Sequence, residues 1–252
     1  MALRLAEMSW PEVERAVAAG HTTVILPLGA TEQHGPHLPL GTDTVRAGAL
    51  AELLAERLPG ALVAPALPFG CSDEHAGFPG LLGVEKETLA RLLVEAARRA
   101  AAWGARRLVL LSAHGGNGEA LALAREALRR ELPQLAVWSE EDLLSPSPAL
   151  ASVARREGIP EGELGLHAGE GETSEMLSLR PDLVRRDRAR PGYTGDMRAV
   201  VEALRSGGLR AAHESGVLGD PTRAEAGRGD AYLEARAEEL ARAVLGGLDG
   251  GR

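Results

Sequence analysis

One pattern recurs along the first half of this chain: a short apolar run, then a loop, then a segment rich in Ala and Leu. The apolar runs cover residues 22–28, 61–67 and 107–112, and the Ala/Leu-rich segments after them cover residues 44–58, 86–103 and 119–131. A fourth apolar run occupies residues 134–138. Strands that alternate with helices indicate an α/β fold with a mostly parallel sheet, because parallel neighbours need a long crossover connection.

The rest of the sequence is less regular. Ser9 is suited to cap a short helix that begins near Trp10. Thr42 or Asp43 is suited to cap the helix over residues 44–58. We also predict a helix over residues 172–179 and a final amphipathic helix over residues 229–247, whereas residues 181–227 carry no clear pattern. No linker or repeat divides the 252 residues, so we expect a single domain spanning residues 1–252.

Composition excludes several classes of partner. The net charge of −8 disfavours binding to nucleic acid or to an anionic membrane, because both carry negative charge. The sequence has neither a signal-peptide pattern nor an apolar run long enough to span a bilayer. Cys71 is the sole cysteine, which excludes an intramolecular disulfide and fits a reducing compartment. We therefore expect a cytoplasmic protein with no membrane or nucleic-acid partner.

The loop after the first predicted strand is the richest in reactive side chains. Its sequence, TEQHGPHLPLGTD over residues 31–43, holds Glu32, His34, His37 and Asp43 and is stiffened by two prolines. If the loop is extended, Glu32 and His34 leave the same face of the backbone because they are two residues apart. Carboxylate and imidazole groups in this arrangement are suited to bind one or two divalent metals. An ordinary polar loop is the alternative, but it would not require a second histidine cluster elsewhere.

That second cluster follows the third predicted strand, in the sequence SAHGGNG over residues 112–118. Gly115 and Gly116 allow the backbone to turn sharply after His114 and to approach a ligand closely. Backbone N–H groups at a helix start can hold an anion or a developing oxyanion. We therefore predict that Gly115, Gly116 and Asn117 contact the substrate. The alternative is a glycine-rich turn with an incidental histidine.

Two further loops carry candidate residues. In residues 167–175, His167 is a candidate general acid or base, because histidine changes charge near neutral pH. Glu172 in the same segment is a candidate metal ligand. Glu170 and Glu175 fit equally well as acidic residues that favour a helix N-terminus. In residues 71–80, Phe78 is a candidate apolar wall of the substrate site.

Glu74 and His75 of that same loop are candidate polar contacts to the substrate. Cys71 fits a small packed residue better than a nucleophile. The carboxyl ends of parallel strands meet at one edge of a sheet. The loops at residues 31–43, 71–80 and 113–118 are therefore expected to gather there, although they are far apart in the sequence.

Five strings together resemble the creatininase, or creatinine amidohydrolase, family. They occur in the order TEQHGPHLPLGTD, HAGFPG, AHGGN, HAGEGETS and GVLGDP, within about residues 20–235. The resemblance implies a three-layer α/β/α sandwich and assembly into homo-oligomers, often hexamers. It also implies a two-metal site that hydrolyses an amide-type C–N bond.

The resemblance assigns metal ligands residue by residue. Glu32 and His114 match ligands of one metal, His34 matches a ligand of the other, and Asp43 matches the carboxylate that bridges both. A set of oxygen and nitrogen ligands without cysteine suits Zn, Mn or Fe(II). We therefore expect two divalent metal ions per chain.

The chain departs from the family pattern in two places. Creatininases proper have a glutamate ligand two residues after the histidine ligand, where this chain has Gly116. Glu172 is our candidate replacement for that metal ligand. His167 matches the proposed catalytic histidine of the family. Creatininases also hold creatinine with tryptophans near that histidine. None of the three tryptophans here directly precedes His167; they are Trp10, Trp103 and Trp138. Family members with the HGGN string include a deformylase and a peptidase that trims a cofactor precursor.

We expect a metal-dependent hydrolase that cleaves a non-peptide amide, cyclic amide or formamide C–N bond of a small molecule with a metal-activated water. His167 or Glu172 would move the proton to the leaving nitrogen. Three alternatives remain open: a peptidase that trims a cofactor-precursor peptide, a two-metal phosphoesterase, and a non-catalytic metal-binding scaffold. The metal loops lack clustered Arg or Lys to hold a phosphate, which disfavours the phosphoesterase.

Overall fold

A parallel sheet of five strands forms the centre of the computed structural model, which describes residues 2–140, 142–144, 147–196, 200 and 208–249. In sheet order the strands are β1 (Leu3–Arg4), β3 (Ala61–Val63), β2 (Thr23–Leu28), β4 (Arg107–Ser112) and β5 (Ala136–Ser139). Every neighbouring pair in this sheet runs parallel, as the repeated pattern predicted. The central strands β2 and β4 are apolar on both faces, which is typical of a sheet covered on both sides.

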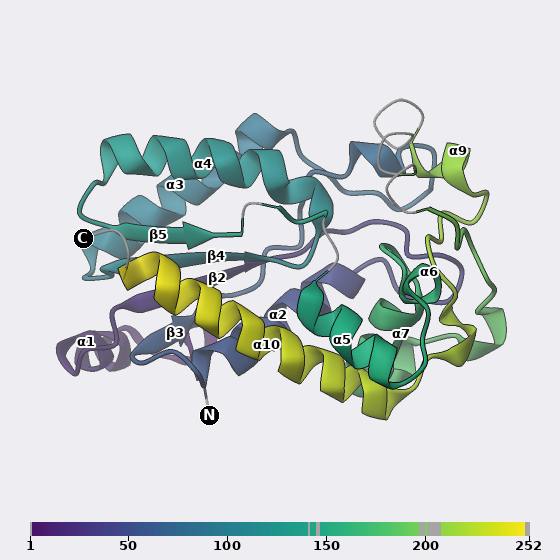
Figure 1. Cartoon of the computed structure of the whole chain (residues 1–252). Helices are drawn as coiled ribbons and strands as arrows, with labels where there is room; N and C mark the ends of the chain where they lie inside the picture. The colour runs from purple at the N-terminus through teal and green to yellow at the C-terminus, as the bar shows by residue number, and fades with distance from the viewer. Residues whose placement is uncertain (1, 141, 145–146, 197–199, 201–207, 250–252) are drawn as a thin grey trace.

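Helices cover the two faces of the sheet (Figure 1). On one face, α3 (Lys86–Ala102) and α4 (Gly118–Glu131) share an apolar core with alternate residues of β2 and β4, such as Leu26 and Leu110. On the other face, α2 (Thr42–Ala55) and α10 (Ala226–Asp249) pack on the intervening residues, such as Ile25 and Val109. The fold is therefore the expected three-layer α/β/α sandwich.

Shorter helices lie at the two ends of the sheet (Figure 1). Those near the carboxyl ends of the strands are α5 (Pro148–Arg156), α6 (Glu161–Leu164), α7 (Glu170–Leu179) and α9 (Leu209–Ala212). At the opposite end, α1 (Trp10–Ala18) begins as predicted after Ser9, whose N–H donates to the Glu12 carboxylate at 2.6 Å. Single 3-10 turns are Leu5–Glu7, Asp73–His75, Gly115–Asn117, Pro181–Leu183, Arg186–Arg188 and Pro221–Arg223. Within the described residues, we find no helix with the length and apolarity needed to cross a membrane.

A buried polar cluster fastens α7 to the C-terminal helix α10. Glu170, at the first position of α7, is fully buried. Its carboxylate accepts hydrogen bonds from the Tyr232 hydroxyl at 2.7 Å and from the Arg228 guanidinium. A buried carboxylate needs such partners, because leaving it unpaired is costly. Glu170 therefore joins two helices, a role beyond the predicted helix-dipole effect.

Several element boundaries differ from the predictions. The predicted strand over residues 61–67 ends at Val63, because Pro65 has no N–H to continue the ladder, and only Leu67 rejoins β2 through a bridge to Leu28. The helix α2 has Gly41 as its N-cap, so neither Thr42 nor Asp43 caps it. The Thr42 hydroxyl instead donates to the Pro39 carbonyl at 2.7 Å.

Some elements were missed or shifted. The edge strand β1, the helices α5 and α6, and the first two residues of α7 were not predicted from the sequence. The final helix α10 begins three residues earlier than the predicted start at position 229. Residues 197–199 and 201–207, within the segment that had no clear pattern, lie outside the described residues.

The register of β2 and β4 positions the reactive loops. Leu28 at the end of β2 pairs directly with Ser112 at the end of β4. The loops that follow these two residues therefore start side by side at the carboxyl edge of the sheet. This arrangement confirms the expectation that loops far apart in sequence gather at one edge.

Candidate metal centre

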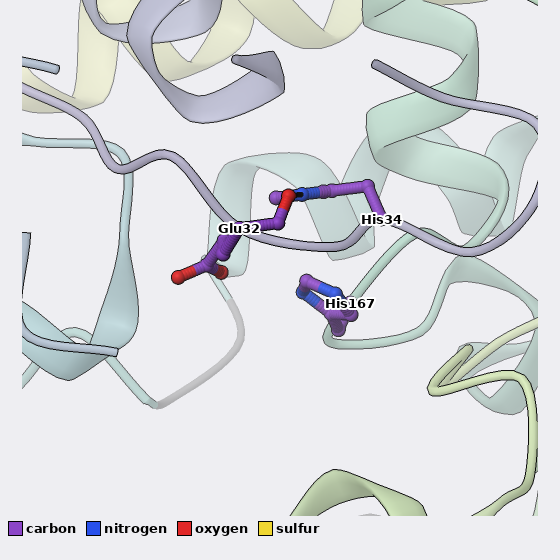
Figure 2. Close-up of side chains that lie close together, drawn as sticks. All are labelled: Glu32, His34 and His167. Atoms are coloured by element: carbon purple, nitrogen blue, oxygen red, sulfur yellow. Dashed lines mark hydrogen bonds between the residues drawn. The ribbon is translucent and has the colours of Figure 1, made fainter. Parts of the chain in front are cut away.

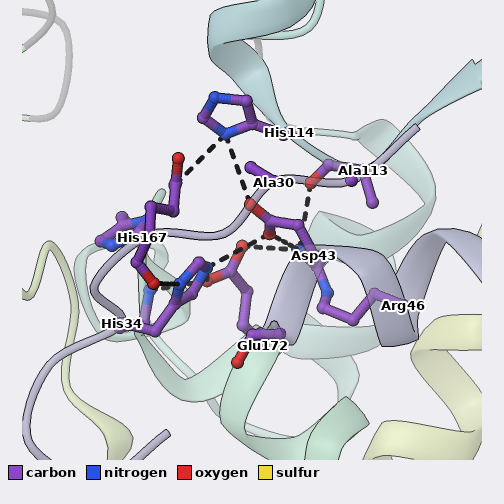
Figure 3. A network of polar contacts seen from close by, with 12 residues as sticks. Ala30, His34, Asp43, Arg46, Ala113, His114, His167 and Glu172 are labelled. Carbon is purple, nitrogen blue, oxygen red and sulfur yellow. Dashed lines mark hydrogen bonds and ion pairs between the residues drawn. The ribbon is translucent and has the colours of Figure 1, made fainter. Parts of the chain in front are cut away.

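Four predicted metal ligands converge at the carboxyl edge of the sheet. Glu32 and His34 come from the loop after β2, Asp43 lies in the first turn of α2, and His114 lies two residues after the end of β4. A hydrogen bond from the Glu32 N–H to the Leu40 carbonyl, 3.0 Å long, closes the first loop. All four ligand side chains are buried, and those of Glu32 and His34 have no exposed surface. Figure 3 shows the polar network around Asp43, to which His34, His114 and Glu172 belong.

One group of ligand atoms comes from Glu32, Asp43 and His114. Nδ1 of His114 lies 3.2 Å from Oε1 of Glu32 and 3.3 Å from Oδ2 of Asp43. Nε2 of the same ring lies 2.7 Å from the carbonyl oxygen of Cys71, which can only accept a hydrogen bond. Nε2 therefore carries the ring hydrogen, and the lone pair of Nδ1 faces the two carboxylates, as a metal ligand requires.

A second group comes from His34, Asp43 and Glu172. Nε2 of His34 lies 3.2 Å from Oδ1 of Asp43 and 3.7 Å from Oε2 of Glu172. Nδ1 of His34 lies 3.3 Å from the Glu32 carbonyl oxygen, which assigns the ring hydrogen to Nδ1. Within each group the ligand atoms lie no more than 4.8 Å apart. Asp43 thus presents Oδ2 to one group and Oδ1 to the other, which is the arrangement of a bridging carboxylate.

Unpaired carboxylate oxygens indicate that a cation fits between these residues. Both oxygens of Glu32 and Oδ2 of Asp43 are buried without a hydrogen-bond partner among the described residues. The 2.9 Å approach of His75 Nε2 to Glu32 Oε1 is close but lacks hydrogen-bond geometry. Buried, unsatisfied carboxylates are costly for a folded chain, and a divalent cation would satisfy them.

The electrostatics of the metal-free chain support the same conclusion. Burial alone would lower the pKa of His34, but the nearby charges of Asp43 and Glu172 outweigh it and raise the pKa to about 9. Burial likewise would raise the pKa of Asp43, but His34 and His114 hold it well below its usual range. Positive charge is therefore stabilised between these carboxylates, and a bound cation would replace the ring protons.

His167 lies beside both groups and is neutral. Figure 2 shows its ring next to Glu32 and His34, and the His34 and His167 ring centroids are 4.3 Å apart. Burial, together with His34 and His75, holds the pKa of His167 well below 6.5. Nε2 of His167 lies 2.8 Å from the Gln33 carbonyl oxygen and 3.0 Å from the Gln33 side-chain nitrogen. The carbonyl oxygen is nearer and can only accept, which assigns the ring hydrogen to Nε2. The arrangement leaves Nδ1 of a neutral ring to accept a proton.

Arg46, which the sequence analysis missed, connects the second group to α7. Its guanidinium donates from Nη1 to Oε1 of Glu172 at 2.6 Å and from Nε to Oε2 of Glu175 at 2.5 Å. Burial would lower the pKa of Arg46, but Glu175, Glu172 and Asp43 raise it above its ordinary value. The three-residue spacing from Asp43 on one helix was the signal that could have identified Arg46, because residues at this spacing share a helix face.

A cavity opens over the candidate metal centre. Four of the six predicted substrate residues line it: Glu74, His75, Gly115 and Gly116. Many of its lining residues are leucines, namely Leu50, Leu143, Leu144, Leu150, Leu164, Leu166, Leu209 and Leu218.

The other two predicted substrate residues do not line this cavity among the described residues. Phe78 packs instead against the apolar cluster of Val200, Leu209 and Leu218. The Asn117 side chain is fully buried; it accepts the Cys71 N–H at 3.0 Å and donates to the Gly29 carbonyl at 3.2 Å. Asn117 therefore braces the loops that carry the ligands. The sequence could not reveal this, because it does not show which way a loop side chain points.

Gly116 has no room for the glutamate that creatininases proper carry at this position. A Cβ atom built on Gly116 would lie 2.1 Å from the Cys71 carbonyl oxygen and 2.5 Å from Nε2 of His114. The same Cβ would lie 2.7 Å from Oε1 of Glu74. In this chain Glu172, from a different segment, supplies a carboxylate oxygen to the group formed with His34 and Asp43.

The family model described as "Creatininase: Creatinine amidohydrolase" matches residues 6–244. The chain belongs to the creatininase family. This membership confirms the resemblance carried by the five strings and the expected class of hydrolase. Family membership also agrees with the three-layer α/β/α sandwich that the structure shows.

Curated relatives of this creatininase-family chain include two differently named enzymes. The "Mycofactocin precursor peptide peptidase" of Mycobacterium tuberculosis (strain ATCC 25618 / H37Rv) is 41% identical over 231 residues, which cover 88% of this chain and 84% of the relative. The "Creatinine amidohydrolase" of Pseudomonas putida is 38% identical over 197 residues, covering 72% of this chain and 74% of the relative.

Solved creatininase structures share the fold over almost the whole chain. A creatinine amidohydrolase crystal structure matches with a TM-score of 0.79 and 30% identity and covers 97% of both chains. A structure described as "Creatininase Mn" has a TM-score of 0.76, and a mutant creatininase described as "Zn-Zn type" has a TM-score of 0.78. Both are 31% identical to this chain and cover 98% of it and 99% of their own length.

Proposed function

We propose that this creatininase-family chain binds two divalent metal ions and hydrolyses an amide bond of a peptide. The observation that carries the proposal is the pair of ligand groups that share Asp43, each with buried carboxylate and imidazole atoms within 4.8 Å of one another. Glu32 and His114 would complete one ion's ligands, and His34 and Glu172 the other's. Zn, Mn and Fe(II) suit such ligands, and solved relatives described as Mn and Zn-Zn forms support this choice.

The bound ions would supply Lewis acidity and lower the pKa of a water molecule at the site. His167 holds its own Nε2 hydrogen on the Gln33 carbonyl, so its Nδ1 is the atom that takes a proton and returns it to the leaving nitrogen. The backbone at Gly115 and Gly116 borders the cavity without side chains. Its N–H groups are suited to stabilise negative charge on a carbonyl oxygen of the substrate.

A peptide is favoured over a small cyclic amide by two observations. The relative with 41% identity over most of both chains is named as a peptide peptidase. The described residues that line the cavity include many leucines and no tryptophan, tyrosine or phenylalanine, so the described wall lacks the large aromatic side chains on which a flat ring stacks best. The creatinine amidohydrolase relative from Pseudomonas putida keeps a cyclic amide as the second candidate substrate.

A substrate panel tests this proposal. Protein purified without chelators would be analysed for metal and then incubated with tetrapeptides built from Gly, Leu and Val, with creatinine, with N-formylglycinamide and with p-nitrophenyl phosphate. We expect about two ions per chain and cleavage of the peptides, detected by mass spectrometry. Asp43→Asn should lose both the ions and the cleavage, whereas the exposed Asp187→Asn should keep both.

Other results of the substrate panel would change the proposed function in specific ways. Cleavage of creatinine or the formamide alone would replace the peptide with a small amide. Phosphate-ester cleavage alone would favour the phosphoesterase. Two ions with no turnover of any compound would favour the metal-binding scaffold, and full peptide cleavage by metal-free protein would overturn the proposal.

A further inference from the structure

We propose that Arg46 is the positioning residue of the second ligand group: its guanidinium fixes the Glu172 carboxylate with one oxygen aimed at His34 and Asp43. The proposal rests on the proposed two-metal function. It assigns Arg46 no contact with substrate or ion. It explains how a glutamate from α7 can serve a site whose other ligands follow β2 and β4.

The Glu172 carboxylate is held at both of its oxygens. Oε1 accepts from Nη1 of Arg46 at 2.6 Å, and Oε2 accepts from the Ala168 N–H at 2.6 Å. These two contacts fix the plane of the carboxylate and turn Oε2 toward Nε2 of His34, 3.7 Å away. Ala168 presents its N–H from a left-handed backbone conformation with φ of 51°, which is uncommon for a residue other than glycine.

Glu172 needs this support because it lies at the rim of the buried centre. Its side chain is 16% exposed and lines the cavity, whereas the side chains of Glu32 and Asp43 are at most 2% exposed. A glutamate in this place could turn out into the cavity at little cost. Gly116 offers no replacement carboxylate, since a side chain there would collide with the Cys71 carbonyl.

Arg46 is suited to this task by its shape and its place in the fold. It lies one turn after Asp43 on α2, and its Nη1 atom is 3.4 Å from Oδ1 of Asp43 and 3.3 Å from the Ala113 carbonyl oxygen. The planar guanidinium can contact several acceptors in fixed directions, which a lysine ammonium cannot do. The Arg46 side chain therefore contacts three parts of the site: the bridging Asp43, the backbone just before His114, and the Glu172 carboxylate.

A simpler role for Arg46 would be to neutralise Glu175, which is 1% exposed and bonded to Nε of Arg46. The two roles can be separated. If only charge balance matters, removing both charges at once should leave the metal centre intact. If Arg46 positions Glu172, the same double substitution should still weaken the second ion.

The test counts and titrates Zn²⁺ on the full chain. Wild type, Arg46→Lys, Glu175→Gln and the charge-neutral double variant Arg46→Met/Glu175→Gln would be loaded with Zn²⁺ and passed through gel filtration. Bound Zn²⁺ would be measured by elemental analysis, Kd values by chelator competition, and folding by circular dichroism. We expect two ions on wild type and on Glu175→Gln. We expect the double variant and Arg46→Lys to bind one ion normally and the second with a Kd raised about 10- to 100-fold.

The outcomes separate this proposal from the proposed function. A folded double variant that holds two ions with wild-type Kd values would overturn the positioning role and leave the two-metal function standing. Wild-type protein that binds no Zn²⁺ would overturn both. If the double variant does not fold, Arg46→Lys decides: wild-type Kd values in that variant would overturn the proposal, and a selective loss of the second ion would support it.

Discussion

Nε2 of His114 is held 2.7 Å from the carbonyl oxygen of Cys71, so the loop after β3 sets the tautomer of a residue at the end of β4. The other ring nitrogen of His114 therefore faces Glu32 and Asp43 before any ion arrives. A ligand that is already oriented loses less entropy on binding, which favours tight and selective metal binding.

Because the two oxygens of Asp43 face different ligand groups, we predict that substitutions of single ligands remove one ion and leave the other. His114→Ala should lose the ion shared with Glu32 and keep the other, and His34→Ala should do the reverse. Asp43→Ala should lose both, because its two oxygens serve different groups. Metal-to-chain ratios after gel filtration would show this pattern. Equal loss of both ions in every variant would contradict separate ligand groups.

His167 is predicted to act in proton transfer and not in metal retention. His167→Gln should keep both ions while kcat falls about 10²- to 10⁴-fold, the usual contribution of a general acid or base. The measurement is the turnover of a cleaved peptide beside a metal assay of the same sample. Loss of an ion in His167→Gln would instead place His167 among the metal ligands. Ligand atoms of Glu32, His34 and His167 do lie within 4.8 Å of one another.

Gly116 is predicted to be intolerant of any side chain. Gly116→Ala should destabilise the fold by about 1–3 kcal/mol, because its Cβ would lie 2.1 Å from the Cys71 carbonyl oxygen. Gly118→Ala is the matched control, since a Cβ there meets nothing within 4 Å and the position opens α4. Urea denaturation of both variants would measure the difference. Equal stability of the two would show that the loop relaxes easily.

His37 is predicted to make stability fall in acid. The ring is fully buried with Nε2 2.9 Å from the Thr173 hydroxyl, and burial, followed by the charge of His34, lowers its pKa to about 4. The unfolded chain takes up the proton near pH 6.5, so the contribution of neutral His37 is complete above pH 6.5 and disappears as pH falls through 4. His37→Gln should therefore lose less stability than wild type between pH 7 and 4.5 in urea denaturation. Parallel losses would refute the assignment.

Assembly remains a prediction from the family resemblance alone. We expect a homo-oligomer, with a hexamer as the order that the resemblance suggests. Light scattering during gel filtration measures the mass directly, and a monomer at micromolar concentration would contradict it.

The sequence allowed the sheet and the centre's position to be predicted for one physical reason. Parallel strands carry their following loops to one edge, so Glu32 and His114 could be placed together without knowing any side-chain direction. The length of β3 was predicted less well. The apolar run continues past Pro65, but the hydrogen-bond ladder of the strand ends before that residue.

Side-chain direction was the main limit at the site. Asn117 stands beside two glycines that border the cavity, yet its amide turns inward to brace backbone groups. Arg46 was missed because it lies within an Ala/Leu-rich helix, where a single arginine normally points to solvent. The left-handed backbone at Ala168 also has no signature in residue type, since alanine rarely adopts it.

The buried bond between Glu170 and Tyr232 ties the placement of Glu172 to the last helix of the chain. α7 is thus held from two sides, by Arg46 of α2 and by Tyr232 of α10. A substitution that loosens Tyr232 should disturb the carboxylate offered to the second ion while leaving Glu32 and His114 in place. The two ions would therefore differ in how far each depends on distant parts of the polypeptide.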